Sequence, residues 1–220
     1  MHRLLQPRHG LRTPRRPNVL IHGAGGGIGT FAIQWATATG ATVITTAGSD
    51  AKTQIGQSLG ASTAINYRTD DFVAATLAAT DGHGVDAILD VVGADYLDRN
   101  LNCLATDGQL VIIGGNLSPT PLNLGQLIFK GASVTATMLR PPFHPAESRH
   151  HHRRPPRCPT AGRNRRLKPV IDTVVPMSDA AQAHTLLESG SPVGNVVLDK
   201  PEQVINPVTK SPAAAALRIQ

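Results

Sequence analysis

Short apolar runs alternate with longer segments of helical apolar spacing from residue 19 onward. Each apolar or β-branched run predicts a buried strand; the expected strands span 19–22, 42–47, 62–67, 85–92, 109–113 and 133–139. Segments whose apolar side chains recur every three or four residues predict helices; these span 28–39, 51–59, 71–80, 95–105 and 122–130. The strands are apolar throughout, which is typical of a parallel sheet covered by helices on both faces.

This alternation of strand and helix predicts the fold class. We expect residues 18–140 to form an α/β domain, a Rossmann-type doubly wound parallel sheet of about six strands with right-handed crossovers. Such a domain is the size of a nicotinamide dinucleotide-binding domain.

The pattern breaks after residue 140. Residues 141–167 are rich in Arg, His and Pro and show no helical or strand period, so we expect an irregular segment. Order returns over 168–200, with a strand at 169–175, a helix from Ser178 to Glu188 with Ser178 as its N-cap, and a strand at 193–199. The basic residues 1–17 are predicted to be disordered, and residues 201–220 form a tail without a pattern.

The net charge of +6 is concentrated outside the predicted domain. Of the 21 Lys and Arg residues, 14 lie in 1–18 and 140–168, whereas 19–139 carry four cations against nine aspartates. The basic stretches lack interleaved aromatic residues, so we expect no specific nucleic-acid partner. Nonspecific, salt-dependent nucleic-acid binding through these stretches is the alternative that remains.

The chain has no feature that predicts a membrane or a secreted location. No apolar stretch approaches the about 20 residues that span a bilayer. The Arg-rich start lacks the apolar run of a secretory signal. We therefore expect no membrane association and a cytoplasmic protein.

The cysteines and histidines do not predict a metal site. The two cysteines, Cys103 and Cys158, are too few for a four-cysteine zinc site, and Cys103 lies in a helix pattern that favours a small core residue. Three consecutive histidines at 150–152 point in different directions in any regular structure and match no zinc spacing.

The most informative motif is the glycine-rich run GAGGGIG at 23–29, between the first predicted strand and helix. Glycines there permit a tight turn and let the backbone approach a pyrophosphate, which the helix N-terminus attracts. The run can be aligned as Ala24-x-Gly26-x-x-Gly29 or as a short-chain dehydrogenase pattern starting at Gly23. Because no Tyr-x-x-x-Lys pair is present, the first alignment is favoured.

The end of the second predicted strand bears on the choice of nicotinamide cofactor. An NAD-binding fold places an acid at this strand tip, which here reads TTAGS at 45–49 and has Asp50 next to it. Ser49 and Lys52 are spaced to hold a 2′-phosphate, and Tyr67 is placed to cover the adenine or to bind that phosphate. For Lys52 and Tyr67, a solvated surface lysine and a tyrosine at the edge of the core remain equal alternatives.

Several runs together resemble the zinc-free quinone oxidoreductase branch of the medium-chain dehydrogenase/reductase superfamily. They are VLIHGAGGGIG at 19–29, AGSDAK at 47–52, LGASTAINY at 59–67, GVDAILDVVG at 84–93, NCLATDG at 102–108, IGG at 113–115, PVID at 169–172, AAQAHTLLES at 180–189 and GNVVL at 194–198. The resemblance covers about 18–140 and 167–199.

The resemblance implies NADPH as cofactor and hydride transfer to a quinone or a related electrophilic carbonyl compound. It implies that Gly26, Gly27, Ile28 and Gly29 hold the pyrophosphate. It assigns Ser49, Lys52 and Tyr67 to the 2′-phosphate end, and Gly93, Gly114 and Asn116 to the nicotinamide side. It also implies a possible homodimer, and it identifies no catalytic acid or base.

The chain departs from this family in two places. Family members begin with a GroES-like domain that supplies much of the substrate pocket, whereas only 17 residues precede the predicted Rossmann domain at 18–140. We therefore expect a truncated form, in which the strands at 169–175 and 193–199 lack a partner. The composition of 141–166 resembles out-of-frame translation of a GC-rich gene, and the basic N-terminus is explained in the same way.

Three functional hypotheses follow from the sequence. The first is a truncated NADPH-dependent quinone oxidoreductase. The second is a noncatalytic nucleotide-binding remnant of such a reductase, and the third is a basic interaction protein that uses the Rossmann body as a scaffold.

Overall fold

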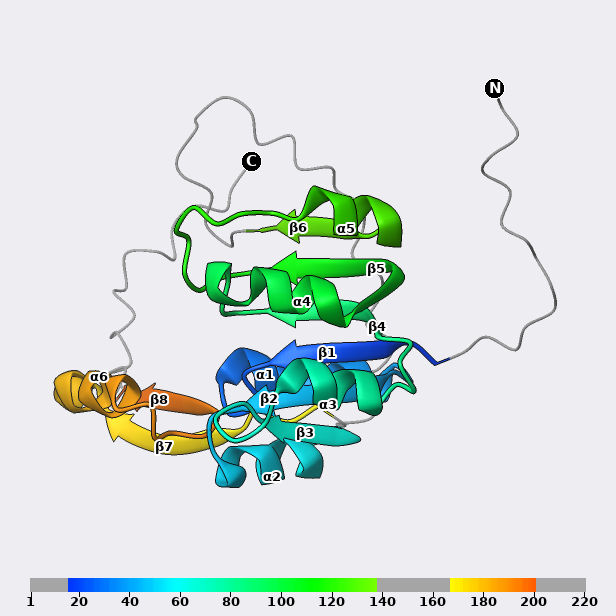
Figure 1. Ribbon diagram of the computed structural model, residues 1–220. Helices are drawn as coiled ribbons and strands as arrows, with labels where there is room; N and C mark the ends of the chain where they lie inside the picture. Colours follow the sequence, from blue (N-terminus) through cyan, green and yellow to red (C-terminus); the bar gives the residue numbers. More distant parts are fainter. Residues whose placement is uncertain (1–15, 138–166, 201–220) are drawn as a thin grey trace, which may run out of the picture.

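The computed structural model describes residues 16–137 and 167–200. In this part of the chain a six-stranded sheet has the order β3-β2-β1-β4-β5-β6, and every neighbouring pair of its strands is parallel. The first strand, β1, lies in the middle of this sheet, with β2 and β3 following on one side. The chain then crosses to the other side of β1, where β4, β5 and β6 follow in order (Figure 1). The predicted doubly wound Rossmann fold is therefore confirmed.

The strands of this sheet are β1 (Asn18–His22), β2 (Thr42–Ala47), β3 (Thr63–Asn66), β4 (Val85–Asp90), β5 (Leu104–Ile112) and β6 (Ser133–Ala136). The connecting helices are α1 (Gly27–Ala38), α2 (Asp50–Ser58), α3 (Phe72–Ala78), the 3-10 turn η1 (Ala94–Tyr96), α4 (Leu97–Cys103) and α5 (Leu124–Lys130).

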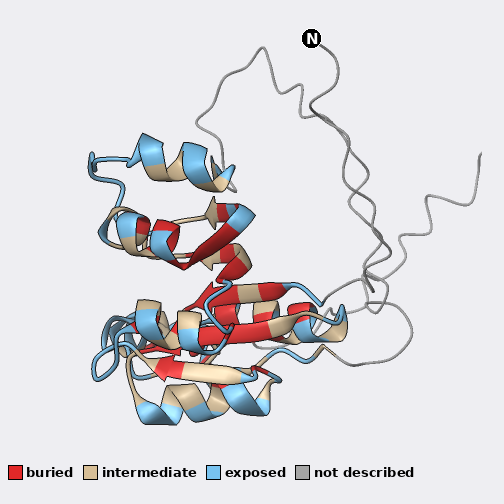
Figure 2. Ribbon diagram, turned by 45° about the vertical axis from the view of Figure 1, so that its right-hand side comes forward, coloured by how far each residue is buried: buried red, intermediate tan, exposed pale blue. Residues whose placement is uncertain are grey.

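The sheet separates two apolar cores, because successive side chains of a strand point to opposite faces. Leu20 and Ile44 belong to the larger core, whereas their neighbours Ile21 and Val43 belong to the smaller one. The larger core contains side chains of α3, α4 and α5, and the smaller core contains mainly those of α1. Figure 2 shows the buried residues concentrated in the central strands, with the outer faces of the helices exposed.

The smaller core extends only as far as β4, whose residue Leu89 packs against it. The β5 side chains that pack in a core are Leu104, Leu110 and Ile112, and all three belong to the larger core. The α1 side of the sheet is therefore less well covered beyond β4 than the opposite side.

The boundary between α4 and β5 differs from the prediction. The helical pattern was expected to continue to residue 105, but Leu104 already pairs with Val85 of β4. The pairing then shifts, so that Ala87 lies opposite Gln109. Pairing with a neighbouring strand, which local spacing does not reveal, decides this boundary.

Residues 167–200 form a second unit of strand, helix and strand: β7 (Ile171–Pro176), the turn η2 (Met177–Asp179), α6 (Ala180–Glu188) and β8 (Asn195–Asp199). The expectation that the two strands lack a partner is wrong, because β7 and β8 pair with each other in parallel. Ser178 is not the N-cap either. It lies in η2, the cap position is held by Asp179, and no side chain caps the helix there.

The C-terminal unit docks beside the start of α1 (Figure 1). Gly194 forms a parallel bridge with Gly26, and its amide donates to the carbonyl of Gly25 at 2.7 Å. At the other end, the side-chain amide of Gln34 both donates to and accepts from the backbone of Lys168, each at 2.9 Å. These backbone contacts place the unit next to the glycine-rich turn.

No helix in the described ranges combines the length and the apolar character that crossing a membrane requires.

Candidate functional site

The glycine-rich turn connects β1 to α1 through backbone hydrogen bonds. The amides of Gly23 and Ala24 both donate to the carbonyl of Thr46 in β2, at 3.0 and 2.8 Å. The chain then folds back so that the amide of Gly26 donates to the carbonyl of Gly23 at 3.1 Å. A Cβ on Gly29 would overlap this Gly23 carbonyl, so only glycine permits the close approach of α1 to the turn.

The first turn of α1 presents free backbone donors. Gly26 is the N-cap and provides no side-chain cap, and no acidic residue lies in the first turn. The amides of Gly27, Ile28 and Gly29 are first-turn donors that an α-helix cannot satisfy internally. Together with the helix dipole, they make this end of α1 favourable for an anion.

A polar hollow of about 680 Å³ opens beside this helix end. It brings together Gly26 and Gly27 of the turn with Ser49, Lys52 and Tyr67, three residues that the sequence assigned to the 2′-phosphate end. Residues 189–192 of the C-terminal unit line its opposite wall. Elements far apart in the sequence thus form one site.

Lys52 crosses this hollow rather than pointing into solvent. Its aliphatic chain lies over Gly25, where a Cβ would meet Lys52 Cδ at 2.6 Å. Its ammonium group donates to the carbonyl of Gly190 in the loop between α6 and β8. Lys52 therefore links the glycine-rich turn to the C-terminal unit.

Two residues at the end of β3 complete the polar wall. The Tyr67 hydroxyl lies over Gly48, where a Cβ would meet it at 2.6 Å. Arg68, the next residue, also lines the hollow and is not among the site residues predicted from the sequence. Its signal was present: it is one of four cations in 19–139 and directly follows Tyr67 at the end of a strand.

Gly93, Gly114 and Asn116 lie at the carboxyl ends of β4 and β5. Gly93 and Asn116 form a parallel bridge, and Gly93 has a φ of +80°, which favours glycine. The Asn116 side chain donates to Asp95 at 2.9 Å, and Gly114 faces open space. The structure brings Gly93 and Asn116 together, but none of the three lines the polar hollow.

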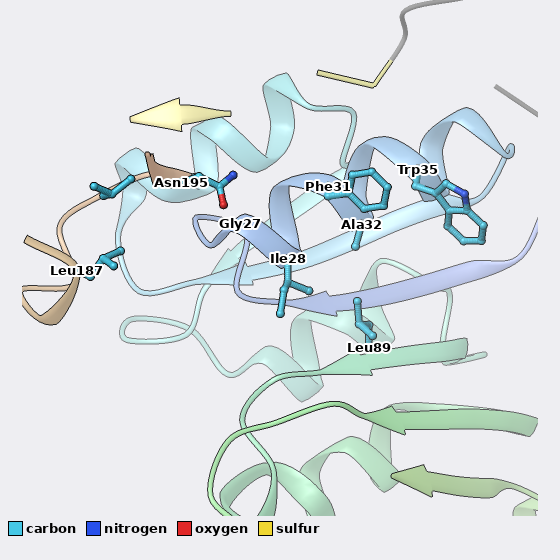
Figure 3. A pocket seen from close by; sticks show the side chains of 10 residues that line it. Gly27, Ile28, Phe31, Ala32, Trp35, Leu89, Leu187 and Asn195 are labelled. Atoms are coloured by element: carbon cyan, nitrogen blue, oxygen red, sulfur yellow. The ribbon is translucent and has the colours of Figure 1, made fainter. Parts of the chain in front are cut away.

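A second, apolar hollow of about 760 Å³ lies on the other side of the α1 N-terminus (Figure 3). Ile28, Phe31 and Trp35 project from α1 along it, and Leu89 of β4 lies opposite Ile28. Ile28 is 54% exposed and contributes its side chain here rather than to the polar hollow. Gly27 lines both hollows, so the two meet at the start of α1.

A buried histidine, which is not among the site residues predicted from the sequence, lies directly before the turn. His22 is fully buried, with Nδ1 2.9 Å from the Thr46 hydroxyl and Nε2 2.8 Å from Asn100 Oδ1. Burial lowers the pKa of His22, and this effect outweighs the Asn100 hydrogen bond and the charge of Asp90, which raise it. His22 is therefore neutral near pH 7.

The described residues contain no group suited to bind a metal ion. In 16–137 and 167–200, no three His, Cys, Asp or Glu side chains converge. Cys103 is buried in the larger core, and this burial raises the pKa of its thiol to about 11. Its predicted place as a small core residue is confirmed. The histidines at 150–152 and Cys158 lie outside the described residues.

Sequence and structure comparisons place this site among known proteins. A family profile described as zinc-binding dehydrogenase matches residues 27–148. Quinone oxidoreductase 1 of Escherichia coli (strain K12) is 34% identical over 191 residues, which are 81% of this chain and 55% of that protein. The chain spans about half the length of the curated relatives it matches.

Solved structures of a quinone oxidoreductase and of an alcohol dehydrogenase are also similar to this chain. The crystal structure of Escherichia coli quinone oxidoreductase complexed with NADPH is similar with a TM-score of 0.62 and 29% identity, over 84% of this chain and 58% of that one. A structure of an NAD-dependent alcohol dehydrogenase has a TM-score of 0.69 and 32% identity, over 84% of this chain and 52% of that one.

Replacing Gly29 tests the turn. In Gly29→Ala the new methyl group overlaps the Gly23 carbonyl, so the turn must open and dinucleotide binding is expected to fall by at least about tenfold. Gly125→Ala is the matched control, because its Cβ would meet only Asn123 Oδ1 at an ordinary 3.5 Å. Calorimetric titration with NADPH measures both variants, and equal affinities would contradict the assigned turn geometry.

The buried His22 predicts a pH dependence of stability. Its folded pKa lies below its ordinary value of 6.5, so at mildly acidic pH the unfolded chain binds more protons than the folded chain. The free energy of unfolding should therefore fall as the pH drops below 6.5, by at most about 1.4 kcal/mol per pH unit. Urea unfolding across this range measures it. His22→Gln should flatten the dependence, and an unchanged slope would assign it to other groups.

Proposed function

The chain belongs to the zinc-binding dehydrogenase family as a quinone oxidoreductase-like member of the medium-chain dehydrogenase/reductase superfamily, and from this we propose that it acts in NADPH-dependent hydride transfer to a quinone or a related electrophilic carbonyl compound. The observation that carries the proposal is the polar hollow at the α1 N-terminus, which combines free first-turn amides with two cations, Lys52 and Arg68.

The glycine-rich turn fits a pyrophosphate. Gly27, Ile28 and Gly29 would bind it with backbone amides at the positive end of the α1 dipole, whereas the Gly26 amide already donates to the Gly23 carbonyl and Gly26 would contribute only close approach. The missing side chain at Gly26 leaves room for phosphate oxygens to approach the backbone, because a Cβ there would meet only the Gly23 carbonyl at 3.7 Å. At Gly27 the same space is taken by the Asn195 side chain. The Ile28 side chain faces the apolar hollow and would not itself contact the phosphates.

The wall of the polar hollow favours NADPH over NADH. Ser49, Lys52, Tyr67 and Arg68 surround the space where a 2′-phosphate would lie. Lys52 would exchange the Gly190 carbonyl for a charged acceptor, and hydrogen bonds between charged partners are stronger. Asp50, the acid nearest the strand tip, accepts instead from Asn66 at 2.8 Å. That contact leaves it poorly placed to bind a ribose hydroxyl.

The nicotinamide end of the bound cofactor would extend toward Gly93, Gly114 and Asn116. Bound NADPH supplies the hydride, so the chain needs no nucleophile of its own for that step. The residues of the chain hold the cofactor and, through apolar side chains such as Ile28 and Leu89, exclude water nearby.

We propose a second copy of the chain as a partner. β6 is the outer strand of the sheet, and beside it α5 exposes Ile128 and Phe129 to 79% and 90%. Among residues 16–137 and 167–200 no strand pairs with the outer edge of β6, and such an edge next to an apolar helix favours pairing with another edge.

Light scattering of the purified chain tests this dimer. We expect the mass of a dimer, and Phe129→Glu should shift it toward the monomer because it places a charge in the apolar contact. Leu187→Glu, at a half-exposed position on α6, is the control. A monomer at all concentrations would contradict the dimer.

Cofactor titration tests the proposed function. Following cofactor fluorescence, we expect tight NADPH binding and weaker NADH binding. Lys52→Met should weaken NADPH binding by about 10- to 100-fold, as expected for the loss of one charge-assisted hydrogen bond, and should leave NADH binding nearly unchanged. Lys200→Met, at an exposed position after β8, is the control.

The outcomes separate the hypotheses. Equal affinity for both cofactors, or no loss in Lys52→Met, would contradict the 2′-phosphate assignment. No binding of either cofactor would refute the proposed function. NADPH binding without quinone reduction would favour a noncatalytic nucleotide-binding remnant.

A further inference from the structure

Four polar side chains are buried between the two halves of the sheet. Thr46 is in β2 and pairs with His22, the last residue of β1. Asp90 is the last residue of β4, and Asn100 lies in α4. Each is at most 1% exposed. Buried polar groups are costly unless they are hydrogen-bonded, so their arrangement must satisfy every member.

The direction of each hydrogen bond can be derived. Asp90 is an acceptor when ionised, so the Asn100 group 3.1 Å from it must be the amide Nδ2, which donates. Asn100 Oδ1 then faces His22 Nε2 at 2.8 Å and needs a donor. His22 therefore carries its proton on Nε2, and Nδ1 accepts from the Thr46 hydroxyl at 2.9 Å.

The surroundings of His22 favour this single neutral form. The rings of Phe72 and Tyr96 pack edge-on against it, with centroids 5.1 and 5.0 Å away. The charged groups that act on it are Asp90 and Arg99, and Arg99 is itself paired with Asp71 at 2.9 Å. A neutral imidazole, with one donor and one acceptor, matches the chain of hydrogen bonds in one direction only.

The two ends of this hydrogen-bond network hold the two halves of the proposed cofactor site. At one end, the Thr46 carbonyl anchors the glycine-rich turn by accepting from Gly23 and Ala24. At the other end, Asp90 accepts from the amides of Val92 and Gly93, at 2.6 and 3.2 Å. Val92 in turn accepts from the amide of Asn116 at 2.8 Å.

We propose that His22 is a positioning residue, which acts through Thr46, Asn100 and Asp90. It fixes the Gly93 loop, meaning Val92 and Gly93 after β4, relative to the glycine-rich turn. The inference rests on the proposed function, because it assigns the turn to the pyrophosphate and the Gly93 loop to the nicotinamide side. A dinucleotide bound across both needs them at a set separation, and His22 lies in the middle of the connection.

Substitutions at two adjacent threonines test the connection. Thr46→Val removes the hydroxyl that donates to His22 and keeps the side-chain shape and the backbone carbonyl. Thr45→Val is the matched control, because Thr45 is equally buried and its hydroxyl donates to the Ile21 carbonyl, outside the network. Thr46→Ser restores the hydroxyl. We expect similar losses of urea midpoint in both valine variants, but about tenfold weaker NADPH binding in Thr46→Val alone, with recovery in Thr46→Ser.

Amide hydrogen exchange gives a second readout that needs no cofactor. In Thr46→Val the amides of Val92 and Gly93 should exchange faster than in Thr45→Val, although they lie at the far end of the network. Equal exchange in the two variants would overturn the proposal, as would a nitrogen NMR spectrum showing the His22 proton on Nδ1. If the unaltered chain binds no NADPH but the exchange result holds, the proposed function fails and the network stands.

Discussion

Helix α1 begins so close to the end of β1 that a Cβ on Gly29 would overlap the carbonyl of Gly23, and the site depends on this contact. The Cα of Gly29 lies against the carbonyl of Gly23, a position that no side chain allows. The turn is held in place by the Thr46 carbonyl, which accepts from two successive amides. As a result Gly26 and Gly27, at the start of α1, line the polar hollow, where the positive end of the helix favours an anion.

The two faces of the sheet are covered unequally, and this shapes the space around α1. The larger core fills the side of α3, α4 and α5, whereas the smaller core ends at Leu89. The apolar hollow lies where this cover ends, and the polar hollow lies on the other side of the same helix end. A ligand with a charged end and an apolar reacting end suits this arrangement.

The C-terminal unit is part of the site rather than an appendage. β7 and β8 satisfy each other's backbone groups, and the unit then contacts the glycine-rich turn through Gly194 and Lys52 through Gly190. Asn195 lies against Gly27, at the point where the two hollows meet. Residues about 170 positions apart in the sequence therefore line the same site.

The sequence by itself determined the Rossmann fold, because apolar periodicity and glycine turns act over a few residues and were visible for every strand and helix of the main sheet. It also located the glycine-rich turn, Ser49, Lys52 and Tyr67. Only the tertiary structure decided the partners that depend on residues distant along the chain. Pairing with Val85 makes β5 begin at Leu104, and β7 pairs with β8. Lys52 donates a hydrogen bond to the carbonyl of Gly190. The role of His22 belongs to this second group, since a buried hydrogen-bond network exists only once β1, β2, β4 and α4 have packed together.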